Sequence, residues 1–432
     1  MKIGRLVDNM LQIILHDWPG WLLILLSFYI IISLREKWKD DNLTFALCFV
    51  LAMHHVIALT NTYLFRIKGA DADAHRFHRL AVEWAASGKL LITVDAEFYQ
   101  QFLGIFYRIF GPSHLFGEEL SIIAFLFSCL VLIKLIHLVN LKKYQVGLLL
   151  MFGLLPTNLV LCSVTLRESY QILFFMLAVY WGLRFHLEPT KGAMIFCVFS
   201  AIIMGCFHKA LILYMLFLLP LLFLWFSKQV FSSPDSRWRF TRKRFIIISA
   251  ILILIIGILI IGVLLKIQGL EVLASVFSGK GLKYAVDYRT ILMFEIAPDA
   301  RANYGIMLET SSLGSLIKTA SLVYIYYLFA PFPWQITNWL DAYAFTESLL
   351  RFILILFSII SWYRAEGLQR SIWGLLLIIY FSMTLLWSTG TVNYGTSIRH
   401  HILSNWIIII AGGSRLIEFL VKQYRRIFQF TP

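Results

Sequence analysis

Long apolar runs separated by short polar segments make up most of the chain. A helix needs about 20 apolar residues to cross a bilayer. The pattern predicts spanning helices at Trp21–Leu34, Leu43–Phe65, Ser121–Val139, Val146–Val164, Tyr170–His186, Ala193–Phe207, Ala210–Phe226, Phe245–Leu265, Leu350–Trp362, Ser371–Trp387 and Ile402–Leu420. A further apolar stretch covers Ser315–Ala330. We therefore expect an all-α polytopic integral membrane protein of about 11–13 transmembrane helices, with residues 1–432 in a single transmembrane domain.

Two segments after the second run have a helical rather than a continuous apolar pattern. In the first, every third or fourth residue is apolar, and the resulting stripe consists of Ala74, Phe77, Ala81 and Trp84. The second, Ala96–Phe110, gathers its aromatic residues on one helical face. Both patterns predict amphipathic helices that lie on the outer membrane surface, within a long first outer loop.

The positions of Lys and Arg predict the orientation, because cytoplasmic loops are enriched in them. Basic clusters occur at Arg35–Lys39, Lys142–Lys143, Lys228–Arg244, Arg364–Arg370 and Lys422–Arg426. All five can lie inside if the Ser315–Ala330 stretch is re-entrant or interfacial. The outer loops are then 66–119, 266–314 and 388–401, and residues 227–244 form a basic cytoplasmic loop. Loops longer than a connection requires often carry function, so we expect the functional surface outside.

Composition agrees with a protein folded in lipid. The chain is 59% hydrophobic and 14% charged, and a soluble protein would carry nearly twice that charged fraction. The net charge of +14 follows mainly from the basic cytoplasmic loops, so it does not indicate a nucleic-acid partner. The five cysteines lie in apolar stretches without metal-ligand spacing, which favours neither a disulfide framework nor a zinc site.

Two aspartates in the first outer loop are candidate catalytic residues. Asp71 and Asp73 are separated by one residue and stand among Arg and His side chains. Helix capping explains either aspartate alone, but the pair with its basic neighbours exceeds what a cap requires. A carboxylate near cations stays ionised and can act as a general base. The pair could also bind a divalent metal such as magnesium or manganese through oxygen ligands, and this alternative stays open.

Several cations fall on the outer side, where basic residues should be few. Turn polarity or snorkelling explains each of them singly. Together they indicate an anion site, and arginine is well suited to phosphate. At membrane depth that phosphate would belong to a lipid phosphate or pyrophosphate. The candidate binding residues are Arg167, Glu168, His208, Lys209, Arg289, Arg301, Arg399 and His400.

Short motifs along most of the chain resemble one enzyme family. The motifs are Asp73-Ala-His-Arg-Phe77-His78-Arg-Leu-Ala81, Glu97-Phe-Tyr-Gln, Phe106-Tyr-Arg-Ile-Phe-Gly111, Pro156 followed by Arg167-Glu168, Pro331-Phe-Pro-Trp334, and Asn393-Tyr-Gly-Thr396 with Arg399. In this order they resemble the GT-C class of membrane glycosyltransferases, particularly bacterial members associated with exopolysaccharide synthesis. One departure is the run Trp21–Leu34, which precedes the helix leading into the acidic loop.

The resemblance implies a GT-C-like fold and a specific activity. A sugar would pass from a polyprenyl phosphate or pyrophosphate to a saccharide or lipid-linked acceptor, on the outer face of a bacterial inner membrane, in surface polysaccharide biosynthesis. The implied catalytic base is an outer-loop aspartate, with Asp73 the first candidate and Asp71 the second.

Other functions fit parts of the pattern. An O-antigen or capsule polymerase or ligase would rely on outer-loop arginines, for which Arg289 and Arg301 are suited. A lipid-sugar transporter is less favoured, because charged residues inside the runs are few and the halves of the chain are not related. A structural membrane subunit would not need outer loops rich in His, Arg and Asp.

Overall fold

A computed structural model describes residues 15–67, 71–89, 93–188, 190–225, 270–296 and 302–429. Within these ranges the chain is helical, and the only β pairing is an isolated bridge between Asn303 and Asn393. Six helices are long and apolar enough to cross a membrane: α2 (Trp18–Trp38), α3 (Asp41–Tyr63), α6 (His114–Leu138), α17 (Trp339–Arg364), α18 (Gly367–Gly390) and α19 (Tyr394–Gln429). The protein is therefore a multi-pass α-helical membrane protein. The predicted run Phe245–Leu265 lies outside the described residues.

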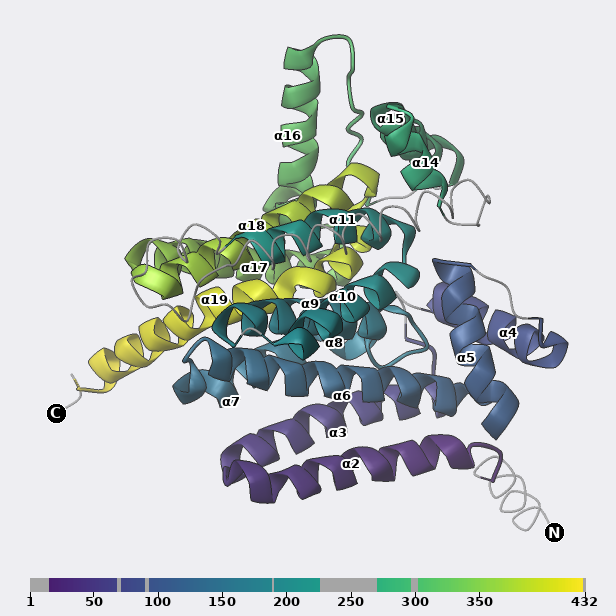
Figure 1. Ribbon diagram of the computed structural model, residues 1–432, viewed down its shortest axis with the longest axis vertical. Helices are drawn as coiled ribbons and strands as arrows, with labels where there is room; N and C mark the ends of the chain where they lie inside the picture. Colours follow the sequence, from purple (N-terminus) through teal and green to yellow (C-terminus); the bar gives the residue numbers. More distant parts are fainter. Residues whose placement is uncertain are drawn as a thin grey trace.

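Shorter helices complete the bundle. They are α7 (Gln145–Gly153), α8 (Pro156–Leu161), α9 (Glu168–Leu187), α10 (Lys191–Cys206), α11 (Lys209–Leu224), α14 (Glu271–Phe277) and α15 (Gly281–Ile291). Most of the long helices run in a similar direction (Figure 1). Gly412 allows α19 to approach α17 closely, because a Cβ there would lie 2.3 Å from the carbonyl oxygen of Leu354.

One predicted span is broken in the structure. The run Val146–Val164 forms α7 and α8 with a break between them, and α8 begins at Pro156. Proline has no amide proton and restricts the residue before it, so a helix commonly ends there and a new one begins. The side-chain amide of Asn158 donates to the carbonyl oxygen of Phe152 at 2.8 Å and satisfies a carbonyl near the break.

The two predicted amphipathic helices are α4 (Asp71–Ser87) and α5 (Ala96–Phe110). They lie at the end of the bundle opposite the C-terminus (Figure 1). The apolar stripe of α4 packs against the protein, because Ala74, Phe77 and Ala81 are buried in the main apolar core, and the location of both helices on the outer membrane surface stays a prediction. Close packing explains the difference: a Cβ at Gly104 of α5 would lie 2.5 Å from the Trp84 ring.

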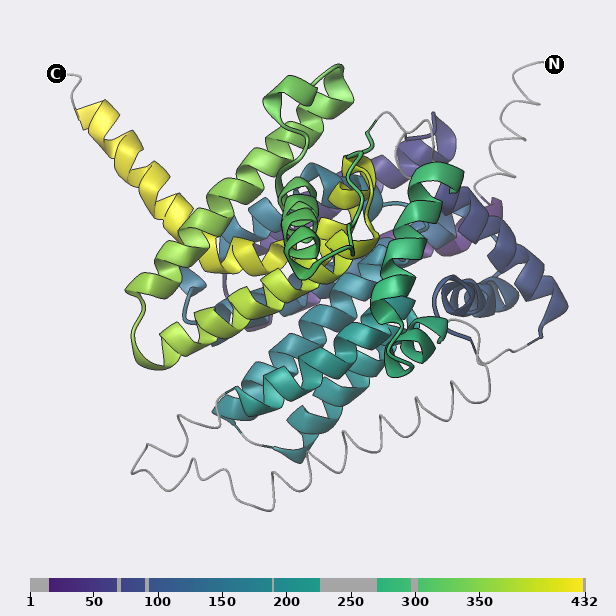
Figure 2. The ribbon, with the colours of Figure 1, turned by 90° about the horizontal axis from the view of Figure 1, so that it is seen from above.

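The apolar stretch predicted not to cross the membrane fully is α16 (Leu313–Phe329). It runs across the direction of the long helices and is seen end-on after a quarter turn (Figures 1 and 2). It is therefore not one of the parallel helices of the bundle.

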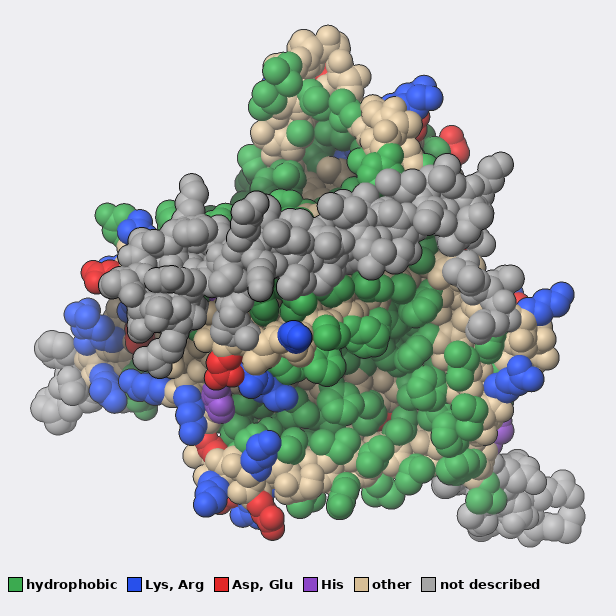
Figure 3. Space-filling view, viewed as in Figure 1, with side chains coloured by type: hydrophobic (Ala, Val, Ile, Leu, Met, Phe, Trp, Pro, Cys, Tyr) green, Lys and Arg blue, Asp and Glu red, His purple; other side chains and the backbone are tan. Residues whose placement is uncertain are grey.

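Basic residues from distant parts of the chain gather at the end from which α19 projects. Lys143, Lys422, Arg425 and Arg426 surround one hollow there, and Arg364 lines a neighbouring one. Figure 3 shows Lys and Arg side chains at this end and a broad apolar surface beside them. Three of the predicted basic clusters thus share one end of the bundle, and the α4–α5 hairpin occupies the other.

Candidate functional site: a polar cavity with paired arginines

A cavity of about 380 Å³ lies between the α4–α5 hairpin and the ends of α9, α15, α18 and α19. Its wall includes charged and imidazole side chains that are far apart in sequence. They are Asp73, Arg76, Arg167, Glu168, His208, Arg399 and His400. Six of these seven were predicted as site residues from the sequence, and Arg76 is the addition. The fold thus brings most of the predicted acids and cations into one cavity.

Arg399 is the centre of this arrangement. Its Nη1 donates to the carboxylate of Asp73 on α4, and its Nε donates to the carboxylate of Glu168 at the start of α9. The side chain of Glu168 is 5% exposed and that of Asp73 is 49% exposed. A buried guanidinium is stable only when it is paired and hydrogen-bonded. The buried Glu168 therefore holds Arg399 on the protein side, and Asp73 is exposed enough for a ligand to reach it.

A second ion pair fixes Arg167 in the same wall. Its Nη1 donates to the carboxylate of Asp95, which directly precedes α5, and to the carbonyl oxygen of Phe207 at 3.2 Å. The guanidinium also lies over the ring of Phe77, 5.8 Å from its centroid. Asp95 is not recognisable as a site residue from the sequence, because a single aspartate before a helix has the pattern of an ordinary cap.

Two histidines flank an indole on the cavity wall. The ring of His400 stacks on Trp387 with centroids 4.1 Å apart, and His208 meets the same indole edge-on at 4.7 Å. Nδ1 of His208 accepts the amide proton of Ala210 and caps α11 at 3.1 Å. Nδ1 of His400 lies 2.8 Å from the hydroxyl of Thr391. Both rings are thereby oriented, and they enclose the indole of Trp387, which is itself buried.

The remaining predicted residues do not line the cavity in the described structure. Lys209 lies next to it, with Nζ 5.6 Å from the centroid of the Tyr288 ring, which itself lines the wall. Arg289 is buried and donates to the carbonyl oxygens of Ile306 at 2.9 Å, Thr391 at 2.8 Å and Ser388 at 3.3 Å. It connects α15 and the segment around Ile306 to the end of α18, and its contact with a phosphate stays a prediction.

Two of the predictions cannot be placed. Arg301 lies outside the described residues, and Asp71 is described only as the first residue of α4. Among the described side chains, no group of three or more His, Cys, Asp or Glu is arranged to hold a metal ion. The question of a divalent metal at the Asp71–Asp73 pair therefore stays open.

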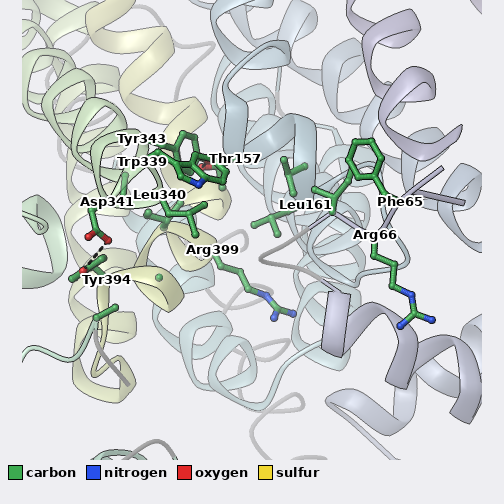
Figure 4. Close-up of a pocket in the computed structure, with 16 residues that line it drawn as sticks. Phe65, Arg66, Thr157, Leu161, Trp339, Leu340, Asp341, Tyr343, Tyr394 and Arg399 are labelled. Carbon is green, nitrogen blue, oxygen red and sulfur yellow. Dashed lines mark hydrogen bonds between the residues drawn. The ribbon is translucent and has the colours of Figure 1, made fainter. Parts of the chain in front are cut away.

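A larger cavity of about 600 Å³ adjoins the polar one. Its wall is mainly apolar and comes from α8, the start of α17 and α19, and the segment after α3. Arg399 belongs to the walls of both cavities. In Figure 4 it lies between Leu340 of α17 and the Phe65–Arg66 segment. Asp341 in this wall accepts hydrogen bonds from Tyr394 Oη at 3.0 Å and Thr337 Oγ1 at 2.7 Å, so its charge is locally compensated.

Comparisons of the chain with protein-family models, curated proteins and solved structures find no match. The assignment of a function therefore depends on the geometry of the two cavities and on the motifs in the sequence.

Proposed function

We propose that this protein is a GT-C-like membrane glycosyltransferase that uses a polyprenyl phosphate or pyrophosphate sugar as donor. The observation that carries the proposal is the position of Arg399, which belongs to the walls of an apolar cavity and a polar cavity and holds Asp73 in the polar one. A donor with a lipid chain, a phosphate and a sugar has the same order of apolar, anionic and polar parts.

The apolar cavity would receive the first isoprenoid units of the donor. Phe65, Leu161 and Trp339 provide the contact surface, and burial of each methylene contributes about 0.8 kcal/mol. The phosphate would then lie near Arg399 and Arg167, and the sugar would extend further into the polar cavity. Arg76 also lines that cavity and forms no ion pair with a described residue, so it can meet a phosphate without breaking an existing pair.

In the proposed reaction, the acceptor hydroxyl attacks the anomeric carbon of the donor sugar. A bond forms between the acceptor oxygen and that carbon, and the bond from the carbon to the phosphate oxygen breaks. The hydroxyl proton passes to Asp73, and the lipid phosphate or pyrophosphate leaves with its electron pair. General-base catalysis contributes roughly 10²- to 10⁴-fold, and cations that meet the developing phosphate charge lower the barrier further.

Asp73 is suited to the base role by its exposure and its anchoring. One carboxylate oxygen is held by Arg399, so the group keeps a fixed orientation, and about half of its surface is accessible. A capping aspartate at the start of a helix would not need a buried arginine from α19. We place the reaction on the outer face of a bacterial inner membrane, in the assembly of a surface polysaccharide.

The decisive experiment measures sugar transfer by the purified protein in lipid nanodiscs. Polyprenyl phosphate and polyprenyl pyrophosphate sugars are supplied separately with a mixture of saccharide acceptors. Asp73→Asn should lower turnover by about 100-fold or more, because it removes the proton acceptor and nearly preserves the shape. The matched control is Asp41→Asn. It changes an exposed carboxylate that is paired with Arg35, at the end of α3 away from the polar cavity.

Three outcomes separate the possibilities. Loss of turnover in Asp73→Asn with full activity in Asp41→Asn supports the proposal. Absence of turnover with both donors refutes the enzyme assignment. An active Asp73→Asn together with an inactive His400→Ala would favour the polymerase or ligase alternative, which is supported by the histidines and arginines of the same cavity.

A further inference from the structure

Asp95 combines features that an ordinary helix cap does not have. It occupies the N-cap position of α5 with φ 72° and ψ −136°. A residue with a Cβ rarely adopts this conformation, which is nearly restricted to glycine. Lys39 and Asn140 also have positive φ in the described structure, but they follow helices at the other end of the bundle.

The side chain of Asp95 does not cap its helix. Asp is a preferred N-cap because its carboxylate accepts an amide proton of the first turn, but no such hydrogen bond is present in α5. The carboxylate instead accepts a hydrogen bond from Nη1 of Arg167. Neither capping nor backbone geometry thus accounts for an aspartate at this position.

Both members of the pair are tied to the same turn. The Asp95 amide donates to the carbonyl oxygen of Cys206 at 2.8 Å, and Arg167 Nη1 donates to that of Phe207 at 3.2 Å. Their side chains are 18% and 15% exposed. Arg167 lines the polar cavity, and its Nε is buried without a hydrogen-bond partner among the described atoms. The guanidinium can therefore be moved little without loss of its contacts.

We propose that Asp95 is a positioning residue, which holds the Arg167 guanidinium at the place in the polar cavity where the donor phosphate binds. This inference rests on the proposed function, since the phosphate belongs to that donor. The unfavourable backbone of Asp95 is retained because it aims the carboxylate at Arg167. Loss of the carboxylate should then impair the reaction even where it improves folding.

The test compares three substitutions with one matched control. Asp95→Gly and Asp95→Ala both remove the carboxylate, but only glycine relieves the backbone. Asp95→Asn keeps a hydrogen-bond acceptor and removes the charge. Asn140→Gly is the control, because it changes another residue with positive φ far from the cavity. The measurements are kcat, KM, melting temperature, and binding of farnesyl pyrophosphate by calorimetry.

We expect Asp95→Gly and Asp95→Ala to lower kcat about 10- to 100-fold, the usual consequence of a displaced catalytic cation. Asp95→Asn should retain part of the activity. Asp95→Gly should melt roughly 1–3 °C above Asp95→Ala, and both should bind farnesyl pyrophosphate about tenfold more weakly than wild type. Asn140→Gly should keep wild-type activity and binding.

The readouts keep this inference separate from the proposed function. Wild-type turnover and binding in Asp95→Gly would refute the positioning role and leave the transferase intact. If wild type transfers no sugar but binds farnesyl pyrophosphate more tightly than Asp95→Gly, the transferase is refuted and the positioning role stands. A wild type that neither transfers nor binds refutes both. If activity falls only in proportion to melting temperature across the variants, the pair is structural and the inference is wrong.

Discussion

A partly buried histidine in α4, His78, makes the stability of the α4–α5 hairpin depend on pH. The Tyr107 hydroxyl lies 2.7 Å from Nδ1 of His78, and burial raises the pKa of Tyr107 well above its usual value, so the hydroxyl remains the donor. Burial, with the neighbouring His114 and His75, lowers the pKa of His78 to about 3. His16 acts in the same direction, and Asp17 opposes it.

The sign of the pH effect follows from this pKa. The unfolded chain has a histidine pKa near 6.5, so between pH 6.5 and 3 the unfolded state binds more protons than the folded state. The stabilising contribution of neutral His78 is complete above pH 6.5 and is lost progressively as the pH falls. The loss is at most about 1.4 kcal/mol for each pH unit below 6.5.

We therefore predict that the melting temperature falls between pH 7.5 and pH 4.5 and that His78→Gln reduces this dependence. Glutamine can accept the Tyr107 hydrogen bond but does not titrate. Thermal unfolding in nanodiscs at a series of pH values provides the measurement. An unchanged pH dependence in His78→Gln would show that another group is responsible.

At the scale of single residues, the sequence indicates which charged residues are candidates for the site, but it does not indicate their partners. Asp73, Arg167, Glu168 and Arg399 are candidates because the sequence predicts charges on the outer side of the membrane, where basic residues are normally few. Their pairing could not be predicted, since the hydrogen bond from Arg399 to Asp73 joins positions 326 residues apart. Asp95 was missed because its backbone conformation, which distinguishes it from a cap, is visible only in the structure.

At the scale of elements, the close contact between α4 and α5 determines where Asp73 lies. A Cβ at Gly104 would lie 2.5 Å from the Trp84 ring and 3.0 Å from the carbonyl oxygen of Ala81. Neither a tightly packed indole nor backbone can yield easily, and overpacking of this kind costs about 1–3 kcal/mol. A displaced α4 would also withdraw Asp73 from Arg399.

Gly104→Ala should therefore lower both the melting temperature and the rate of sugar transfer. Gly192→Ala in α10 is the matched control, because a Cβ there meets no atom within 4 Å. Thermal unfolding and the transfer assay are measured on both variants. Full stability and activity in Gly104→Ala would mean that the α4–α5 contact tolerates an added methyl group and does not fix the site.

Helical periodicity predicted α5 more accurately than continuous hydrophobicity predicted the buried runs. The amphipathic pattern over Ala96–Phe110 coincides with the observed helix, because the helical alternation of polar and apolar residues begins and ends at these two residues. A uniformly apolar run contains no such alternation, so it does not show where one helix ends and the next begins. The break between α7 and α8 was therefore not predicted, although the sequence contains Pro156. The surface against which the apolar face of α4 packs depends on α5, and the sequence of α4 alone does not specify this neighbour.

At the scale of the whole molecule, the two ends of the bundle differ in their basic residues and in the elements that they carry. One end gathers Lys143, Arg364 and Lys422, and the other carries the α4–α5 hairpin and the polar cavity. The tendency of basic residues to stay in the cytoplasm predicts that the cavity lies outside. The proposed lipid-linked donor depends on this predicted orientation, because a sugar activated outside the cell membrane has to arrive on a lipid carrier.

Cysteine labelling tests this orientation without reference to catalysis. The native cysteines, which are free thiols, are first replaced by serine or alanine, and one new cysteine is introduced at an exposed position of either end. In cells that express the protein, Arg79→Cys on α4 should react with a membrane-impermeant maleimide. Lys143→Cys should react only after the membrane is permeabilised. Both positions are exposed, so a difference in labelling reports the side of the membrane and not burial. The reverse pattern would place the polar cavity in the cytoplasm, where soluble nucleotide sugars are present. A lipid-linked donor would then not be required, and the ion pairs of Arg399 would have to bind another ligand.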